Sequence, residues 1–316
     1  MRGRSIVLLI FSVLIILAGS WTGYTAFLTK RNNRACLHVE GTNGSRSAPP
    51  SDETARALQS ALDEYSAETG EVGLQATVIF PDGAVWNGSA GYADHRRKCP
   101  MTLAHHLYIG SITKLYTATL VLDRIEAGAF SLDDPISRWA DLPYGDDVTV
   151  RMLLDHTSGI PSYTEDTWFL LRYLALPRKR WTPGELTAVL EGKSLRFSPG
   201  TRHEYSNSNY LLLGVILESV TGSSYSALLS GLMEDELDLF RTHYLDYPDD
   251  VPLANGYDTS ILRLGRRNLS GFRASLETGA FSAGGIMSTA ADTARFVHSL
   301  FTEGILSGPT LSRMLT

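Results

Sequence analysis

A serine and a lysine stand three residues apart at the expected start of a helix, in the stretch YIGSITKLYTA at 108–118. Residues three apart lie on the same face of a helix, so the Ser111 hydroxyl and the Lys114 amine can come within hydrogen-bond distance. The apolar residues that follow predict a buried helix, and burial lowers the pKa of a lysine. The pattern is therefore typical of a serine nucleophile with its own amine base.

A second polar motif lies about ninety residues downstream, where Tyr205 and Asn207 form Tyr-x-Asn just before the apolar run LLLGVILE at 211–218. A Ser-x-x-Lys pair alone has a simpler interpretation, a helix start with a solvated lysine, and chance supplies about one such pair in a chain of this size. The second motif adds a phenol and an amide to the serine and the amine. The two motifs together favour catalysis.

With these motifs the chain resembles serine hydrolases of the β-lactamase-related family, which includes class C β-lactamases, D-Ala-D-Ala carboxypeptidases and related esterases. Three further stretches stand in the family's order and at about its spacing: LDDPI at 132–136, LLDHTSGI at 153–160 and AGGIMSTAAD at 283–292. The resemblance covers approximately residues 70–316. It implies an α+β fold of the β-lactamase/transpeptidase-like type, with an antiparallel sheet flanked by helices and an all-α domain.

The resemblance also implies roles for four residues. Ser111 is expected to attack an amide or ester carbonyl and become an acyl-enzyme, and its backbone N–H to act as the first oxyanion donor. Lys114 and Tyr205 are expected to share the proton transfers, and the sequence leaves open which of them takes the serine proton. Asn207 is expected to donate to the substrate amide and to orient Lys114.

The family's third motif, a His or Lys followed by Thr or Ser and then Gly on a strand, has no counterpart after Ala291. That strand supplies the second oxyanion N–H in the family, and losing one such donor costs about 2.7–4 kcal/mol of transition-state stabilisation. We therefore expect a domain truncated at its C-terminus with sheet strands missing, either as a shortened product or as a natural protein that has lost this part. Only two strands would remain, with an unpaired edge and an uncovered apolar face.

Several functions stay open within this resemblance. The substrate class comprises peptidoglycan stem peptides ending in D-Ala-D-Ala, β-lactams and small esters or amides. A D-Ala-D-Ala carboxypeptidase-like or general β-lactamase-related hydrolase of the cell envelope is favoured over a dedicated β-lactamase or a small-ester esterase. The alternative from another class is a non-catalytic envelope protein that retains the fold.

The N-terminus predicts a membrane segment over residues 1–27, with basic residues before an apolar run at 6–18. The unbroken apolar run at 6–18 has the length of a signal peptide. Together with the less strictly apolar residues up to position 27, it reaches the roughly 20 residues that span a bilayer. We favour a single-pass anchor with the catalytic domain outside the cytoplasm over secretion after cleavage. The polar, Gly-, Ser- and Pro-containing residues 28–52 predict a flexible tether, and residues 53–316 the catalytic domain.

The residues after the tether predict regular elements at the start of this domain. An amphipathic helix is expected to begin at Ser51 or Asp52, either of which can cap it, and to end at Gly70. Two strands are expected next, at 74–80 and 84–92, because the Pro-Asp-Gly between them is a turn signal. Helical patterns dominate the rest of the chain.

Composition and residue spacing argue against other classes of function. The formal net charge of −6 gives no support for nucleic-acid binding. Cys36 and Cys99 are too few for a disulfide scaffold; export would permit a single bridge between them, although Cys36 lies in the predicted tether. His105, His106 and His203 lack a further ligand at useful spacing, so a surface or packing role is favoured and neither metal nor cofactor is expected.

Two other features have more than one interpretation. The stretch DHTSG at 155–159 contains the residue types of a Ser-His-Asp triad, but a serine this close to its own histidine cannot present both side chains in the required geometry. A structural turn beneath the active site is favoured instead. Tyr163, Trp168 and Trp181 either line the substrate groove or belong to the core.

Overall fold

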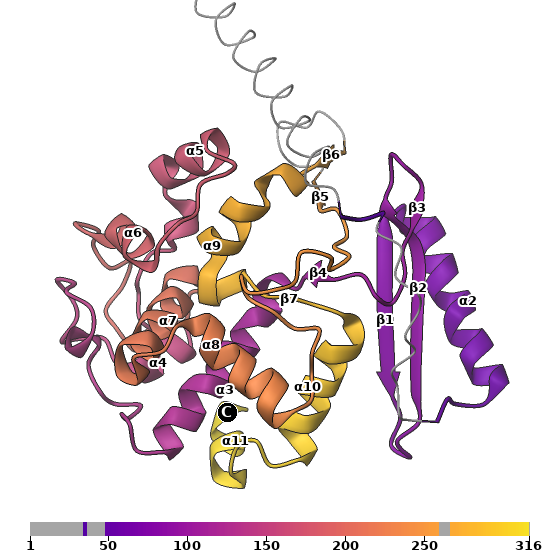
Figure 1. The fold of residues 1–316 in the computed structure, drawn as a ribbon. Helices are drawn as coiled ribbons and strands as arrows, with labels where there is room; N and C mark the ends of the chain where they lie inside the picture. Colours follow the sequence, from indigo (N-terminus) through magenta and orange to yellow (C-terminus); the bar gives the residue numbers. More distant parts are fainter. Residues whose placement is uncertain (1–33, 37–47, 259–265, 316) are drawn as a thin grey trace, which may run out of the picture.

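The computed structural model describes residues 34–36, 48–258 and 266–315. They form an α+β fold in which a small antiparallel sheet, with one long helix on its outer side, lies beside a larger helical part (Figure 1). This α+β arrangement agrees with the fold class that the sequence resemblance implies. The expected membrane segment at 1–27 and most of the expected tether lie outside the described residues.

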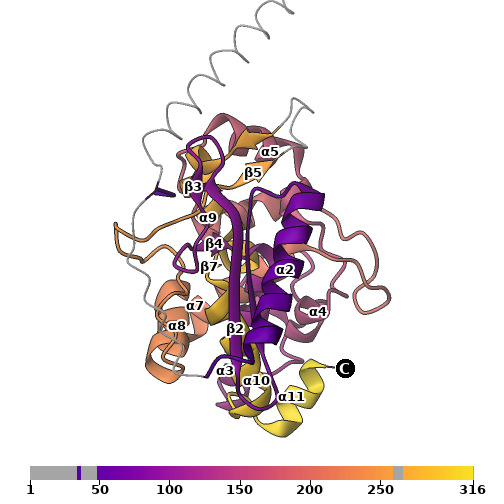
Figure 2. The same cartoon turned by 90° about the vertical axis from the view of Figure 1, so that its right-hand side faces the viewer.

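The sheet begins with the hairpin that the sequence predicts. Strands β1 (Gly73–Ile79) and β2 (Val85–Asp94) pair antiparallel in continuous register around the Pro-Asp-Gly turn. Helix α2 (Asp52–Thr69) precedes them, capped by the Ser51 side chain and ended by Gly70 in the left-handed conformation. It packs across the hairpin (Figure 2). The expected helix and both strands are therefore confirmed to within about a residue or two.

The expectation of a two-stranded sheet is wrong. A short third strand, β3 (Cys99–Pro100), pairs with β2, so the order is β1-β2-β3. Cys99 also forms a disulfide with Cys36, the bridge that the sequence left open, which ties the segment before α2 to this side of the sheet. A two-residue strand has too little pattern to be recognised in a sequence.

The outer edge of β1 faces the helical part of the molecule. No strand within the described residues pairs with it, so the predicted open edge lies on β1. Helix α10 (Ala290–Thr302) packs beside β1, and the Ala290 N–H donates to the Gln75 side chain at 3.1 Å. A groove of about 650 Å³ remains between β1 and α10 and extends to Ile112. The apolar face of the hairpin is thus partly covered by α10.

Two further pairs of short strands connect distant parts of the chain. Strand β4 (Leu107–Tyr108) pairs antiparallel with β7 (Met287–Ser288). Strand β5 (Tyr257–Asp258) pairs antiparallel with β6 (Arg267–Asn268). The first pair matters for the site because it fixes the backbone just before Ser111.

The remaining helical elements make up most of the chain. The α-helices are α3 (Thr113–Glu126), α4 (Val150–Leu154), α5 (Thr167–Ala175), α6 (Pro183–Thr187), α7 (Asn207–Thr221), α8 (Tyr225–Ser230), α9 (Arg273–Gly284) and α11 (Gly308–Met314). The shorter turns are η1 (Gly110–Ile112), η2 (Ile136–Arg138), η3 (Tyr163–Glu165), η4 (Ala188–Leu190), the π-helical η5 (Gly231–Glu236) and η7 (Ser270–Phe272).

Helix α7 is the centre of the helical part, where it packs against α3 and α9. Its run of three leucines at 211–213 is fully buried. Gly214 lies where α7 meets α9, and a Cβ there would fall 2.1 Å from the Ser282 Oγ and 2.7 Å from the Phe281 ring. The glycine therefore permits the close approach of the two helices that carry parts of the site.

Replacing Gly214 with alanine should destabilise the protein by about 1–3 kcal/mol, because the added methyl group overpacks the junction of α7 and α9. Chemical denaturation of the folded chain measures the change. Gly231→Ala is the matched control, since nothing lies within 4 Å of a Cβ at that helical glycine. Equal effects of the two substitutions would contradict this account of the packing.

Within the described residues, no single helix is long and apolar enough to cross a bilayer. Helix α7 and the segment Tyr225–Glu236 pass that test together by length and composition, but they are bent by 88°. The apolar character of α7 is explained by its burial in the helical core.

Candidate active site

Ser111 lies in the short turn η1 at the start of α3, where the local backbone exposes its side chain. The strand pair β4–β7 leads into this turn, and the Ile109 N–H donates to the Ile286 carbonyl at 3.1 Å. Gly110 has a φ of +53°, a conformation that other residues seldom adopt. The serine is therefore held on a sharp, fixed turn, and its N–H belongs to the first turn, where amides lack helical acceptors.

The structure brings the Ser111 hydroxyl to two groups that can accept its proton. The Tyr205 hydroxyl lies 2.7 Å from the Ser111 Oγ, and the Lys114 Nζ lies 3.3 Å from it. Tyr205 comes from the segment just before α7, 94 residues along the chain. Both candidate bases that the sequence singles out are thus in contact with the candidate nucleophile, and the tyrosine is the closer one.

Lys114 is buried and has two fixed acceptors. Its Nζ donates to the Asn207 Oδ1 at 2.9 Å and to the Ala283 carbonyl at 2.6 Å. A neutral amine has two N–H donors and one lone pair, so these acceptors use both donors and leave the lone pair for the Ser111 side. Burial lowers the pKa of Lys114, and its hydrogen bond and charge interaction with Tyr205 partly oppose this. The surroundings therefore favour the neutral amine more than water does.

The Ala283 carbonyl is a site feature that the sequence reasoning missed. Helix α9 is broken at Phe281, whose φ of +43° and ψ of −137° are not helical. The break turns carbonyls near the end of α9 towards α3, where Lys114 and Thr117 donate to them. The stretch at 283–292 is recognisable as a motif, but nothing in its residue types shows that a main-chain oxygen holds the lysine.

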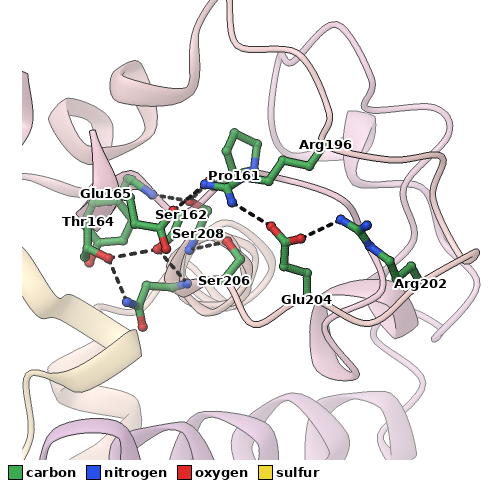
Figure 3. Close-up of polar contacts among 11 residues, drawn as sticks. Pro161, Ser162, Thr164, Glu165, Arg196, Arg202, Glu204, Ser206 and Ser208 are labelled. Carbon is green, nitrogen blue, oxygen red and sulfur yellow. Dashed lines mark hydrogen bonds and ion pairs between the residues drawn. The ribbon is translucent and has the colours of Figure 1, made fainter. Parts of the chain in front are cut away.

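Asn207, the first residue of α7, is fixed at both ends of its amide. Its Oδ1 accepts from Lys114, and its Nδ2 donates to the Thr164 Oγ1 at 2.9 Å. The Ser162 and Thr164 hydroxyls are 2.9 Å apart, and the Asn207 N–H donates to the Ser162 Oγ (Figure 3). These contacts orient the oxygen of Asn207 towards Lys114 and leave one Nδ2 hydrogen for a substrate carbonyl.

A network of ion pairs connects the segment before Tyr205 to η3, on the other side of Asn207; we call these two segments the rim of the site. Glu204 accepts from Arg196 at 2.8 Å and from Arg202 at 2.7 Å (Figure 3). Arg196 also pairs with Glu165, the last residue of η3. Because these side chains are largely exposed, the network positions the rim more than it stabilises the fold.

The His156 ring packs against the Tyr205 ring. The two ring centroids are 4.6 Å apart, and the His156 Nδ1 accepts from the Ser206 N–H and the Asn209 side chain. Burial, followed by the nearby Lys114 charge, lowers the pKa of His156 to about 4. His156 is therefore neutral at pH 7 and acts as an acceptor that fixes the backbone after Tyr205.

The neighbours of His156 do not form a triad. The Asp155 carboxylate accepts from the Thr157 N–H and hydroxyl, and the Ser158 hydroxyl donates to the Asn209 side chain. The structural turn favoured from the sequence agrees with these contacts.

Comparison with known proteins decides the family to which the chain belongs. The beta-lactamase family model matches residues 58–316. The chain belongs to the beta-lactamase family. The fold described above is therefore that of a serine-hydrolase family.

Two solved structures similar to this family member are those of amide hydrolases. The D-amino acid amidase from Ochrobactrum anthropi SV3 is 30% identical, with a TM-score of 0.72 over 82% of this chain and 73% of that chain. The D-stereospecific amidohydrolase from Streptomyces sp. is 29% identical, with a TM-score of 0.72 over 84% of this chain and 78% of that chain.

Among curated relatives, penicillin-binding protein 4* of Bacillus subtilis is 34% identical over 158 residues, which are 48% of this chain and 34% of that protein. The chain spans about a third of the length of the curated relatives that it matches first.

The three aromatic residues that the sequence left open take different positions in this beta-lactamase-family chain. Tyr163 and Trp181 are buried, and the Tyr163 hydroxyl donates to the Gly279 carbonyl at 2.7 Å. Trp168 is 75% exposed on α5. Tyr163 and Trp181 are thus core residues, and Trp168 is a surface residue.

Of the three histidines considered as metal ligands, His203 is exposed, whereas the other two are packing residues. No group of three residues suited to metal binding occurs in the described parts of the chain. His105 and His106 are buried rather than exposed, and His106 stacks on His243 with ring centroids 5.5 Å apart. This stacked pair supports the short strands β4 and β7 beside the site.

The stability of the protein should fall as the pH drops from about 6.5 to about 4. Burial, with the charges of His243 and Arg241, lowers the pKa of His106 to about 4, whereas the unfolded chain titrates near 6.5. Between these values the unfolded chain binds more protons, so acid favours unfolding, and the difference corresponds to about 3 kcal/mol at this site.

Denaturation curves across this pH range test the effect. His106→Asn removes the titrating group and should give a shallower loss of stability with acid. His298→Asn, a change at an exposed histidine of α10, is the control that should keep the wild-type pH dependence. An unchanged pH dependence in His106→Asn would contradict the assignment.

Proposed function

We propose that the chain is an acyl-transferring serine hydrolase that forms an acyl-enzyme on Ser111. The observation that carries this proposal is the contact of one exposed serine hydroxyl with both Tyr205 and Lys114, at 2.7 and 3.3 Å. Membership of a serine-hydrolase family supports the same reaction class. A solvated lysine or a purely structural serine would not need this arrangement.

In the first step the Ser111 oxygen bonds to the substrate carbonyl carbon, and its proton passes to Tyr205 or Lys114. The carbonyl oxygen becomes an oxyanion, which the Ser111 N–H at the start of the helix stabilises. The bond to the leaving nitrogen or oxygen then breaks, and that atom receives the proton. In the second step water attacks the acyl carbon of the ester on Ser111 and gives a proton to Tyr205 or Lys114. The bond from that carbon to the Ser111 oxygen then breaks, the Ser111 oxygen takes this proton, and the acid is released.

The proposed substrates are amides and peptides whose scissile bond adjoins a D-residue, with D-Ala-D-Ala-ended stem peptides as the preferred class. Two structural relatives are named for D-amino acid amides and D-stereospecific hydrolysis, and a curated relative is named a penicillin-binding protein. Asn207 supports this choice because its Nδ2 retains a hydrogen for a substrate amide carbonyl. Small esters and β-lactams remain competing substrates of the same chemistry.

A direct test is to treat the folded protein with the two enantiomers of one amino acid amide, a D-Ala-D-Ala peptide and a penicillin, with Ser111→Ala as the control. Release of D-alanine or preference for the D-amide, absent in the control, supports the proposal. Rapid penicillin turnover without peptide cleavage would assign a β-lactamase instead. Absence of turnover and of any adduct on folded protein would favour the non-catalytic alternative.

We propose further that residues 1–27 anchor the chain in the cell membrane and that residues 28–52 tether the domain at 53–316 outside the cytoplasm. The basic residues before the apolar run at 6–18 support this. The intact mass of the protein purified from membranes provides the test. A mass that includes residues 1–27 supports an anchor. A secreted form whose mass lacks these residues supports cleavage.

A further inference from the structure

Helix α5 (Thr167–Ala175) carries apolar side chains on the side that faces solvent. Phe169 is the one residue of this helix that is buried, whereas Trp168 is 75% and Leu171 52% exposed. Helical spacing places Trp168, Leu171 and Ala175 along one outward side. A surface helix normally presents polar residues there, so an apolar outer side indicates contact with something apolar.

The exposed apolar residues continue around the end of the helix. Leu170 is 47% exposed, and Leu176, which follows the last turn, is 45% exposed. Single exposed leucines are common on protein surfaces, but four large apolar side chains within ten residues are a patch. We call Trp168, Leu170, Leu171 and Leu176 the α5 patch.

The charges around the α5 patch are unbalanced. Arg172, Arg178 and Arg180 are exposed, and within the described residues none of them forms a salt bridge. Arg172 instead lies over the Trp181 ring at 5.1 Å. The free charge beside the patch is therefore positive.

The nearby acidic side chains are already paired. Asp166 binds Lys193 at 2.6 Å, and Glu185 binds Lys179 at 2.6 Å. Because these carboxylates are neutralised, they do not offset the arginines next to the patch. A partner of complementary character must combine an apolar layer with negative charge.

We propose that the α5 patch docks the domain onto an anionic phospholipid surface. A short helix with tryptophan and leucine on its outer side and arginines at its flank has the composition that inserts at the boundary between headgroups and acyl chains. Anionic headgroups attract the arginines, and the apolar side chains enter the layer beneath. A protein partner would not require the α5 patch to lie beside arginines that form no salt bridge.

The direction of the chain agrees with this proposal. Residues 34–36, which the disulfide of Cys36 holds beside β3, lie at the same end of the molecule as α5 in both views (Figures 1 and 2). An anchor at residues 1–27 would therefore enter the domain at the end of the molecule where α5 lies. The patch and the anchor can reach one bilayer together.

Docking through α5 would place the catalytic site close to the lipid surface. Thr164, whose hydroxyl holds the Asn207 amide, is only a few residues before Trp168 in the chain. The Tyr205 side chain, on the same rim, is 47% exposed. A bound surface would thus restrict the site to substrates that can reach it beside the membrane.

Amide hydrogen exchange of residues 167–176 in the full-length chain tests the proposal. The chain is compared without vesicles, with vesicles of phosphatidylcholine alone, and with vesicles that also contain phosphatidylglycerol. We expect exchange in this segment to slow by at least about fivefold in the anionic vesicles alone, and high salt to reverse the effect. Equal exchange in all three conditions would overturn the proposal.

Matched variants separate the α5 patch from the rest of the surface. Trp168→Ser with Leu171→Ser, and separately Arg178→Ser with Arg180→Ser, should each abolish the slowing. Phe301→Ser, at an aromatic residue that is 49% exposed on α10, should retain it. Slowing of exchange that persists in both double variants would overturn the proposal and indicate another membrane-binding surface. Slowing that increases with protein concentration in the absence of vesicles would overturn it and indicate contact with a second copy of the chain.

The outcome is independent of the proposed hydrolase activity. None of the substituted residues contacts Ser111, Lys114 or Tyr205, so acylation of Ser111 by a soluble reagent should remain at the wild-type rate in every variant.

Discussion

Replacing Lys114 with methionine should lower the rate constant for acylation of Ser111 by about 10⁴-fold, the upper end of the range for loss of a positioned acid or base. The substitution keeps an unbranched side chain of similar length in the buried site but removes the amine. The Asn207 Oδ1 and the Ala283 carbonyl also lose their donor. Stopped-flow or discontinuous mass measurements with a penicillin or a fluorophosphonate give the rate constant.

The control for this experiment separates charge from basicity. Lys114→Arg retains a cation and donors, but arginine stays protonated and cannot act as a base. We expect both variants to lose acylation if they are folded, and thermal denaturation reports folding. Unpaired acceptors cost about 1–3 kcal/mol each, so a lower melting temperature is expected for Lys114→Met. Acylation within tenfold of wild type in folded Lys114→Met would contradict the role of the amine.

Replacing Tyr205 with phenylalanine should lower the same rate constant by about 10²–10³-fold, because the phenol is the nearer of the two groups that contact the Ser111 hydroxyl. The pH dependence of the residual rate carries more information. The interaction with Tyr205 raises the pKa of Lys114, so its removal should lower that pKa further. The acid limb of the rate profile should then move to lower pH.

This shift distinguishes the two possible bases. If neutral Lys114 accepts the serine proton, the acid limb persists in Tyr205→Phe and moves as stated. If a Tyr205 phenolate is the base, the limb disappears with the phenol. Phe substitution at Tyr210, whose ring is 5.5 Å from the Lys114 Nζ and whose hydroxyl donates to the Leu154 carbonyl, is the matched control that keeps Tyr205. An acid limb that moved to higher pH in Tyr205→Phe would contradict the account.

The parts of the fold that the sequence predicts well depend on local signals. Ser51 and Gly70 mark the two ends of α2 because capping and the left-handed conformation are properties of single residues. The hairpin of β1 and β2 follows from the Pro-Asp-Gly turn signal between two strand segments. The contact of Ser111 with Lys114 likewise follows from helical spacing, since both residues lie on one turn.

The parts that the sequence did not predict depend on tertiary contacts. Strand β3 has only two residues, and its Cys99 both pairs with β2 and is bonded to Cys36, which is distant in the sequence. The Ala283 carbonyl becomes a lysine acceptor because α9 breaks at Phe281, and no residue type encodes a main-chain direction. The sequence favours a structural role for His156, but its place beneath the Tyr205 ring required the fold.

Asn207 combines both kinds of information. The Tyr-x-Asn motif marks it as a polar anchor, and its contact with Lys114 agrees with that expectation. Its second contact, to Thr164, joins it to the segment that leads into α5 and could not be read from spacing. The rim of the site is therefore connected through hydrogen bonds to the helix whose outer side is apolar.

The most direct test of the central claim is the intact mass of the folded chain after treatment with a fluorophosphonate, beside a Ser111→Ala control. The account predicts one adduct, located at Ser111 by peptide mapping and absent from the control, because Ser111 is the exposed hydroxyl that contacts both Tyr205 and Lys114. No adduct on the folded wild-type chain, or an adduct that remains in Ser111→Ala, would contradict the claim that Ser111 is the activated nucleophile.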